Sequence, residues 1–171
     1  MSELISKLWR LLSLLSLVGA SPQLLSQTAV FQDGVLTVPQ GAAMVDGEIL
    51  HYSNIRLAAD SDGRFTLLDA QSSSLVYVDT VAIEIAESLP VQVRLIVTGS
   101  KSVPCVELME PAVIFNEATF KVALAETSMG PAETCIAMLD PFEVQIPLNV
   151  TGLGAGSYAV SVNGVEGGFS L

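Results

Sequence analysis

The chain has 171 residues, of which 50% are hydrophobic and 15% charged, and its 18 Asp and Glu residues outnumber its 7 Lys and Arg residues. A formal charge of -11 argues against nucleic-acid binding, which draws its affinity from basic side chains that neutralise phosphates. One His and two Cys are too few for a zinc site built on four Cys or on two Cys and two His. We therefore expect a folded, acidic protein with no cofactor and no nucleic-acid partner.

Residues 1–20 have the pattern of a signal peptide. Lys7 and Arg10 precede the apolar run 11–18, and small residues follow it up to Ala20. A short basic start, fewer than about a dozen apolar residues and a small-residue cleavage site are typical of export signals. Cleavage would remove two basic residues and one acidic residue, so the formal charge would change from -11 to -12.

A second interpretation of this segment stays open. Lys7, Arg10, Ser13 and Ser16 recur at every third position, so the segment could be an uncleaved amphipathic helix on a membrane or on the domain. Membrane contact is expected only through such an uncleaved segment. We favour export, which predicts a periplasmic or secreted protein.

The remaining chain is predicted to consist of strands, because its apolar segments are short, β-branched and bounded by turn residues. The expected strands are 35–38, 48–57, 64–68, 75–85 in two pieces, 91–98, 112–115, 119–125, 142–150, 158–162 and a last one ending at Leu171. Hairpin turns are expected at the Asp-Gly pairs 33–34, 46–47 and 62–63 and at the Asn-Gly pair 163–164. Pro147 predicts an edge strand, since proline cannot donate to a ladder. Only residues 130–138 could form a short helical turn.

The predicted fold class is all-β. A change of texture near residues 88–90 divides the chain into a signal peptide at 1–20, an N-terminal β unit at 21–88 and a sandwich at 89–171. The expected architecture is an immunoglobulin-like β-sandwich at the C-terminus, preceded by a smaller strand-rich unit and by the N-terminal signal helix.

The state of the two cysteines depends on the compartment in which the protein is expected to lie. In an oxidising compartment an isolated pair such as Cys105 and Cys135 is expected to form a disulfide. It would close a loop of about 30 residues and contribute on the order of 3 kcal/mol. The alternative, a reactive thiol, needs an activating base, and His51 is the only imidazole in the chain.

A glycine-rich signature lies near the C-terminus. Its members form the pattern G-L-x-x-G-x-Y-x-V-x-V-N-G and are Gly152, Leu153, Gly156, Tyr158, Asn163 and Gly164. We expect the glycines to turn the chain at a sandwich corner, the Tyr158 hydroxyl to reach loop backbone and Asn163-Gly164 to close the last hairpin.

Together with the segments 105–108, 119–124 and 141–148, this signature resembles an immunoglobulin-like sandwich module found at the C-termini of exported bacterial proteins and lipoproteins. The resemblance implies a fold, an exported protein and a bridged cysteine pair. It implies no activity.

Two groups of residues could form functional sites, and for each a structural role is the alternative. A Ser-His-Asp triad would need His51 as its base, but no nucleophile elbow accompanies it, which favours a structural histidine on one strand face with Ile49 and Ile55. Asp60, Asp62 and Asp69 lie in rough register with a calcium loop. Because an alanine, at position 58, replaces the first carboxylate of such a loop, a hairpin turn is favoured.

The remaining motif, Asn149-Val150-Thr151, matches a glycosylation sequon, and we expect Asn149 simply to face solvent.

With no catalytic residue and no metal ligand predicted, we expect a protein that is not an enzyme. It would serve as an exported interaction or structural module of the bacterial cell envelope and bind a protein or another envelope component through loops or a strand edge. The alternative is an inhibitor or accessory subunit of a secreted hydrolase, which would present the loops 99–104 and 127–134 to an active-site cleft.

Overall fold

The computed structural model describes residues 28–171, so the expected signal peptide and its cleavage site lie outside the described residues. This part of the chain contains thirteen strands and no helix, which confirms the predicted all-β class. Accordingly, it offers no helix long and apolar enough to cross a membrane.

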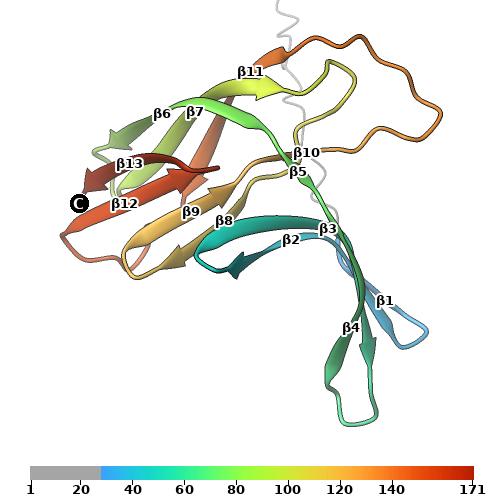
Figure 1. Cartoon of the computed structure of the whole chain (residues 1–171). Helices are drawn as coiled ribbons and strands as arrows, with labels where there is room; N and C mark the ends of the chain where they lie inside the picture. The colour runs from blue at the N-terminus through green and yellow to red at the C-terminus, as the bar shows by residue number, and fades with distance from the viewer. Residues whose placement is uncertain (1–27) are drawn as a thin grey trace, which may run out of the picture.

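A β-sandwich occupies the C-terminal part (Figure 1). One sheet has the order β11-β7-β6 and is built from β6 (Tyr77–Ala86), β7 (Gln92–Lys101) and β11 (Asp140–Leu148). The other has the order β13-β12-β9-β8 and is built from β8 (Ala112–Asn116), β9 (Thr119–Ala123), β12 (Ser157–Val162) and β13 (Val165–Ser170). Most pairs are antiparallel, but β12 runs parallel to β9. A two-stranded ladder joins β5 (Ser74–Leu75) to β10 (Ala125–Glu126).

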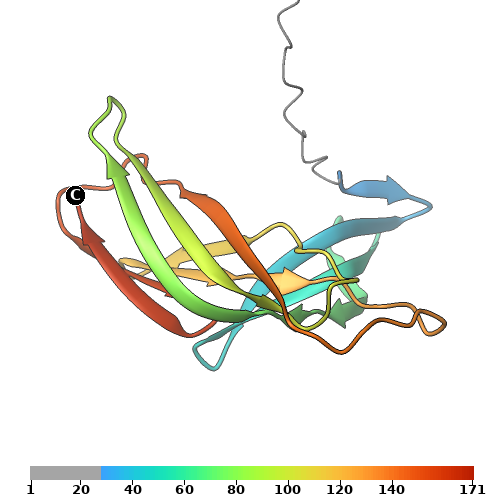
Figure 2. The same cartoon turned by 90° about the horizontal axis from the view of Figure 1, so that it is seen from above.

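The core lies between the two sheets. Alternation along β7 turns Val93, Leu95 and Val97 inward, where they meet Phe120 and Val160 of the facing sheet. Figure 2 shows β6, β7 and β11 running side by side as one curved layer. As predicted from Pro147, β11 is an edge strand.

The N-terminal strands form a second, four-stranded antiparallel sheet. It has the order β1-β2-β3-β4 and consists of β1 (Val30–Gln32), β2 (Val35–Val45), β3 (Glu48–Ala59) and β4 (Phe65–Ser72). The turn between β2 and β3 lies against the sandwich, where the Lys121 ammonium donates to the Gly47 carbonyl. The β1–β2 and β3–β4 hairpins project away from the sandwich (Figure 1).

The change from one unit to the other falls earlier in the chain than residues 88 and 89, where the sequence placed it. That position lies in the connection between β6 and β7, which pair with each other from Tyr77↔Ser100 to Ala86↔Gln92. Because β6 is bonded to the sandwich, the strands themselves change unit between β4 and β5, near residues 72–74.

Three of the four predicted turns, Asp33-Gly34, Asp46-Gly47 and Asn163-Gly164, have positive φ at both residues. At the fourth, Asp62-Gly63, only the glycine has positive φ. The hairpin between β8 and β9 has positive φ at both Glu117 and Ala118, without a glycine. The possible helical turn at 130–138 is instead an irregular segment with one hydrogen-bonded turn, in which the Glu133 amide donates to the Gly130 carbonyl at 3.0 Å, and a separate bend at residue 137.

Candidate functional site

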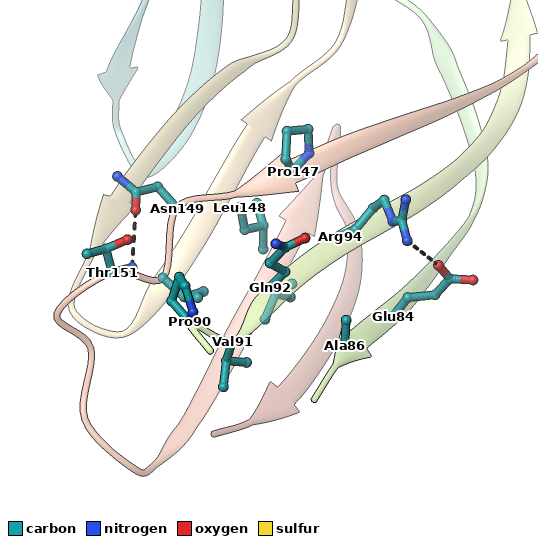
Figure 3. A pocket seen from close by; sticks show the side chains of 12 residues that line it. Glu84, Ala86, Pro90, Val91, Gln92, Arg94, Pro147, Leu148, Asn149 and Thr151 are labelled. Carbon is teal, nitrogen blue, oxygen red and sulfur yellow. Dashed lines mark hydrogen bonds and ion pairs between the residues drawn. The ribbon is translucent and has the colours of Figure 1, made fainter. Parts of the chain in front are cut away.

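A shallow groove of about 300 Å³ opens at one end of the three-stranded sheet (Figure 3). Its lining comes from the end of β6, the start of β7 and the segment that follows β11. The side chains labelled in Figure 3 include Glu84, Gln92, Arg94, Asn149 and Thr151. The volume lies at the small end of the range for ligand sites.

Arg94 dominates the electrostatics of this groove. Its Nη2 lies 3.4 Å from a carboxylate oxygen of Glu84, and its Nη1 donates to the Gln145 side-chain oxygen at 3.1 Å. Both ionic side chains are about half exposed, so the pair contributes little to stability. In the segment after β11, the Asn149 side-chain oxygen accepts the Thr151 amide proton at 3.1 Å. Asn149 is exposed, as predicted.

The groove carries groups that could hold a polar ligand but few that could do chemistry. Its one carboxylate, Glu84, is paired with Arg94, and the lining contains neither His nor Cys. A general acid or base must be free to reach a proton of the substrate, and the Glu84 carboxylate is instead occupied by Arg94. Among residues 28–171, moreover, no three His, Cys, Asp or Glu side chains come together in a way that could hold a metal ion.

His51 lies elsewhere, in the N-terminal sheet. It is 1% exposed, pairs across the ladder with Ala42, and neither ring nitrogen has a hydrogen-bond partner. Burial lowers the pKa of His51 below its ordinary value of 6.5, and the backbone of Glu110 offsets part of that effect. The geometry accords with a structural role, because within residues 28–171 no hydroxyl is hydrogen-bonded to either ring nitrogen.

Cys105 and Cys135 are joined by a disulfide, with their Cα atoms 6.0 Å apart. The bond links two long connections at the opposite end of the sandwich from the groove, residues 102–111 and residues 127–139, which we call the disulfide loops. In the second loop the exposed apolar side chains are Met129, Ile136, Met138 and Leu139. Of the predicted loop 99–104, residues 99–101 belong to β7, so the loop begins at Ser102.

Two buried charged side chains, Lys101 and Glu126, fix the ends of the disulfide loops. Lys101 is buried, donates to the Val106 carbonyl at 2.6 Å and lies 2.9 Å from the Asp140 carboxylate. The Glu126 carboxylate, also buried, accepts the amide proton of Ser102 at 2.8 Å and its hydroxyl proton at 2.5 Å. Residues 127–139 therefore leave and rejoin the sandwich at two points tied to the end of β7.

The signature residues form the corner that the sequence predicted. Gly152 has a φ of 82° in the turn after β11, and the Tyr158 hydroxyl donates to the Gly154 carbonyl at 2.7 Å. The Tyr158 ring stacks on Phe169, with ring centroids 5.5 Å apart. Leu153 packs against the core, and Gly156 exchanges two backbone hydrogen bonds with Leu171.

Asn163 does more than the sequence predicted. Besides shaping the turn, its side-chain oxygen accepts the Leu124 amide proton at 3.0 Å. Its amide nitrogen donates to the carbonyls of Val76 and Leu124 at 2.9 and 2.8 Å. One side chain thus connects the last hairpin to the segments that flank the β5–β10 ladder, a role that no local pattern indicates.

The candidate calcium loop is a hairpin turn. The Asp60 carboxylate accepts the amide protons of Asp62 and Arg64, each at 2.9 Å, and so closes the turn between β3 and β4. Asp69 lies on β4 opposite Arg56 in the ladder.

Comparison with known proteins agrees with the sandwich. Residues 95–171 match the model of a family described as the ORF11 beta-sandwich domain. No curated protein and no solved structure matches the chain. The C-terminal part of the chain therefore carries a β-sandwich domain similar to that family.

Proposed function

We propose that this chain is an exported, non-enzymatic interaction module of the bacterial cell envelope, which binds a protein or another envelope component through the disulfide loops. The observation that carries the proposal is the way these loops are held. A disulfide, the ion pair of buried Lys101 with the partly exposed Asp140, and the buried Glu126 carboxylate fix two long connections beside each other. Function is commonly placed on loops that a rigid scaffold positions.

The loops also present suitable side chains. Ile136 is 65% exposed, and Met138 and Leu139 are exposed beside it. Clustered apolar side chains on a rigid surface are typical of the contact residues that dominate protein interfaces. The disulfide further supports export, because such bonds persist in oxidising compartments.

The proposal is tested by placing a photo-crosslinking amino acid at position 136 in living cells. We expect a discrete crosslinked adduct at Ile136 and none when the same group replaces Thr80, an exposed residue on β6 outside the loops. Equal labelling at both positions, or recovery of the chain in the cytoplasm with free thiols, would contradict the proposal.

A second candidate, inhibition of a secreted hydrolase, is favoured by one feature of the same loops. Residues 127–139 are tied at both ends and carry exposed apolar side chains next to Cys135, as a loop that enters a substrate cleft would require. Inhibition assays against peptidases with apolar specificity pockets test this candidate. Met138→Asp should abolish any inhibition, whereas Glu143→Gln on β11 should leave it unchanged.

A further inference from the structure

One face of the N-terminal sheet is built from apolar side chains. The ladder places Phe31 of β1 opposite Leu36 of β2, Leu36 opposite Leu57 of β3, and Leu57 opposite Leu67 of β4. The adjoining pairs on this face are Val38 with Ile55 and Ala59 with Phe65. We call these eight residues the arm face, and none of them is charged.

The opposite face of the same strands is mixed. There the ladder pairs Arg56 with Thr37 and with Asp69, but the same face also carries Val30, which is 55% exposed, and Val35. Of the two faces, the arm face is the one that is apolar throughout, as expected for a sheet face that is covered.

The sandwich covers the other end of β3. His51 and Ile49 are buried where β3 meets β9, but a bulge between Ser53 and Arg56, with Asn54 at a positive φ, interrupts the alternation before the arm face begins. The β1–β2 and β3–β4 hairpins project away from the sandwich (Figure 1). There Phe31 is 59%, Phe65 52% and Leu67 60% exposed.

We propose that a second copy of this chain covers the arm face, so that two arms pack sheet on sheet in a dimer. This inference stands apart from the proposed function. At roughly 200 Å² for a fully exposed large side chain, Phe31, Phe65 and Leu67 expose on the order of 350 Å². With the half-buried members of the face, two copies bury about 1,000 Å², which reaches the lower limit for a specific interface.

Charge favours a second copy over a lipid surface. The chain has a formal charge of -11, which opposes its approach to anionic headgroups, and its one Trp lies outside residues 28–171. Two acidic copies repel each other too, but the arm face itself carries no charge. Dimerisation should therefore be strengthened by added salt, which screens the repulsion between the acidic surfaces around the two arm faces.

Sedimentation equilibrium of the purified chain tests the dimer, with two variants at adjacent positions of β4. Leu67→Asp places a carboxylate on the arm face, while Thr66→Asp adds the same charge to the opposite face. We expect a dimer for the unmodified chain and for Thr66→Asp, and at least about tenfold weaker association for Leu67→Asp. Circular dichroism and urea unfolding check that each variant is folded, and Phe31→Ser replaces Leu67→Asp if that variant fails to fold.

A monomeric unmodified chain would overturn the proposal, as would equal weakening by Leu67→Asp and Thr66→Asp. A monomer that co-sediments with phosphatidylglycerol vesicles, and loses this binding in Leu67→Asp, would assign the arm face to lipid instead. Neither result depends on crosslinking at Ile136, so failure here leaves the proposed function standing.

Discussion

His51 is the residue whose environment is most unusual in the structure. Its ring is buried, and the backbone of Glu110 offsets only part of the cost of burying a charge, so the protonated form is disfavoured. It lies where the N-terminal sheet meets the sandwich, and its protonation should therefore weaken the packing of these two parts.

The pH dependence of stability follows from the lowered pKa of His51. Between its ordinary value of 6.5 and the lower folded-state value, the unfolded chain binds a proton that the folded chain does not. The full contribution to stability is thus present above pH 6.5 and is lost as the pH falls below it. We expect the melting temperature to fall on acidification from pH 7 to pH 5.5, and His51→Leu to flatten this fall.

The measurement is thermal unfolding followed across that pH range. A difference between the two proteins in this pH range is assigned to His51, which is the one His in the chain. Identical profiles for the two proteins would show that His51 does not govern the acid sensitivity.

At Asn163, the contribution of the turn conformation to stability can be measured separately from that of the side-chain hydrogen bonds. Asn163→Gly keeps the positive φ of 47° accessible but removes three hydrogen bonds and leaves the backbone groups of Leu124 and Val76 short of partners. We expect a loss of about 2–3 kcal/mol in the free energy of unfolding, measured with urea.

The matched control is Asp33→Gly, at the corresponding position of the β1–β2 turn, where the residue also has positive φ. It should change stability by less than about 0.5 kcal/mol. Equal effects at the two turns would mean that backbone conformation alone accounts for Asn163.

Among the elements, the disulfide loops depend most on a single covalent bond. Cys105 and Cys135 close a loop with a sequence separation of 30 residues. Replacing both with Ser should cost about 3–4 kcal/mol, through the gain in freedom of the unfolded chain.

Urea unfolding of the double-serine variant against the oxidised protein measures this cost. Limited proteolysis should also cut the variant first within residues 127–139, while β7 and β12 stay protected. A variant as stable and as resistant as the oxidised protein would show that Lys101 and Glu126 suffice to hold the loops.

The elements also show what sequence patterns could predict. Glycine after Asp or Asn marked the positive-φ turns correctly at residues 33–34, 46–47 and 163–164. The turn at Glu117 and Ala118 has no such mark, because neighbouring strands impose its geometry on residues that do not favour it.

Long-range pairing was the harder part to predict. Alternation identified residues 75–85 as strand but could not assign a partner, so the expected boundary separated β6 from β7. The side-chain contacts of Asn163 and Lys101 were equally out of reach, since each depends on segments that meet only in the fold.

At the scale of the whole molecule, two surfaces stand out from an otherwise acidic protein. The disulfide loops present apolar side chains at one end of the sandwich, and the arm face presents them on the projecting sheet. Because the two surfaces lie on different elements, the proposed envelope partner and the proposed second copy would not compete for the same side chains.

If the chain is an exported, disulfide-stabilised binding module, the intact mass of the protein recovered from cells should be that of residues 21–171 less two hydrogens. This mass corresponds to a cleaved signal peptide and a closed Cys105–Cys135 bond. The mass of the full chain from Met1 with both thiols reduced would contradict this expectation.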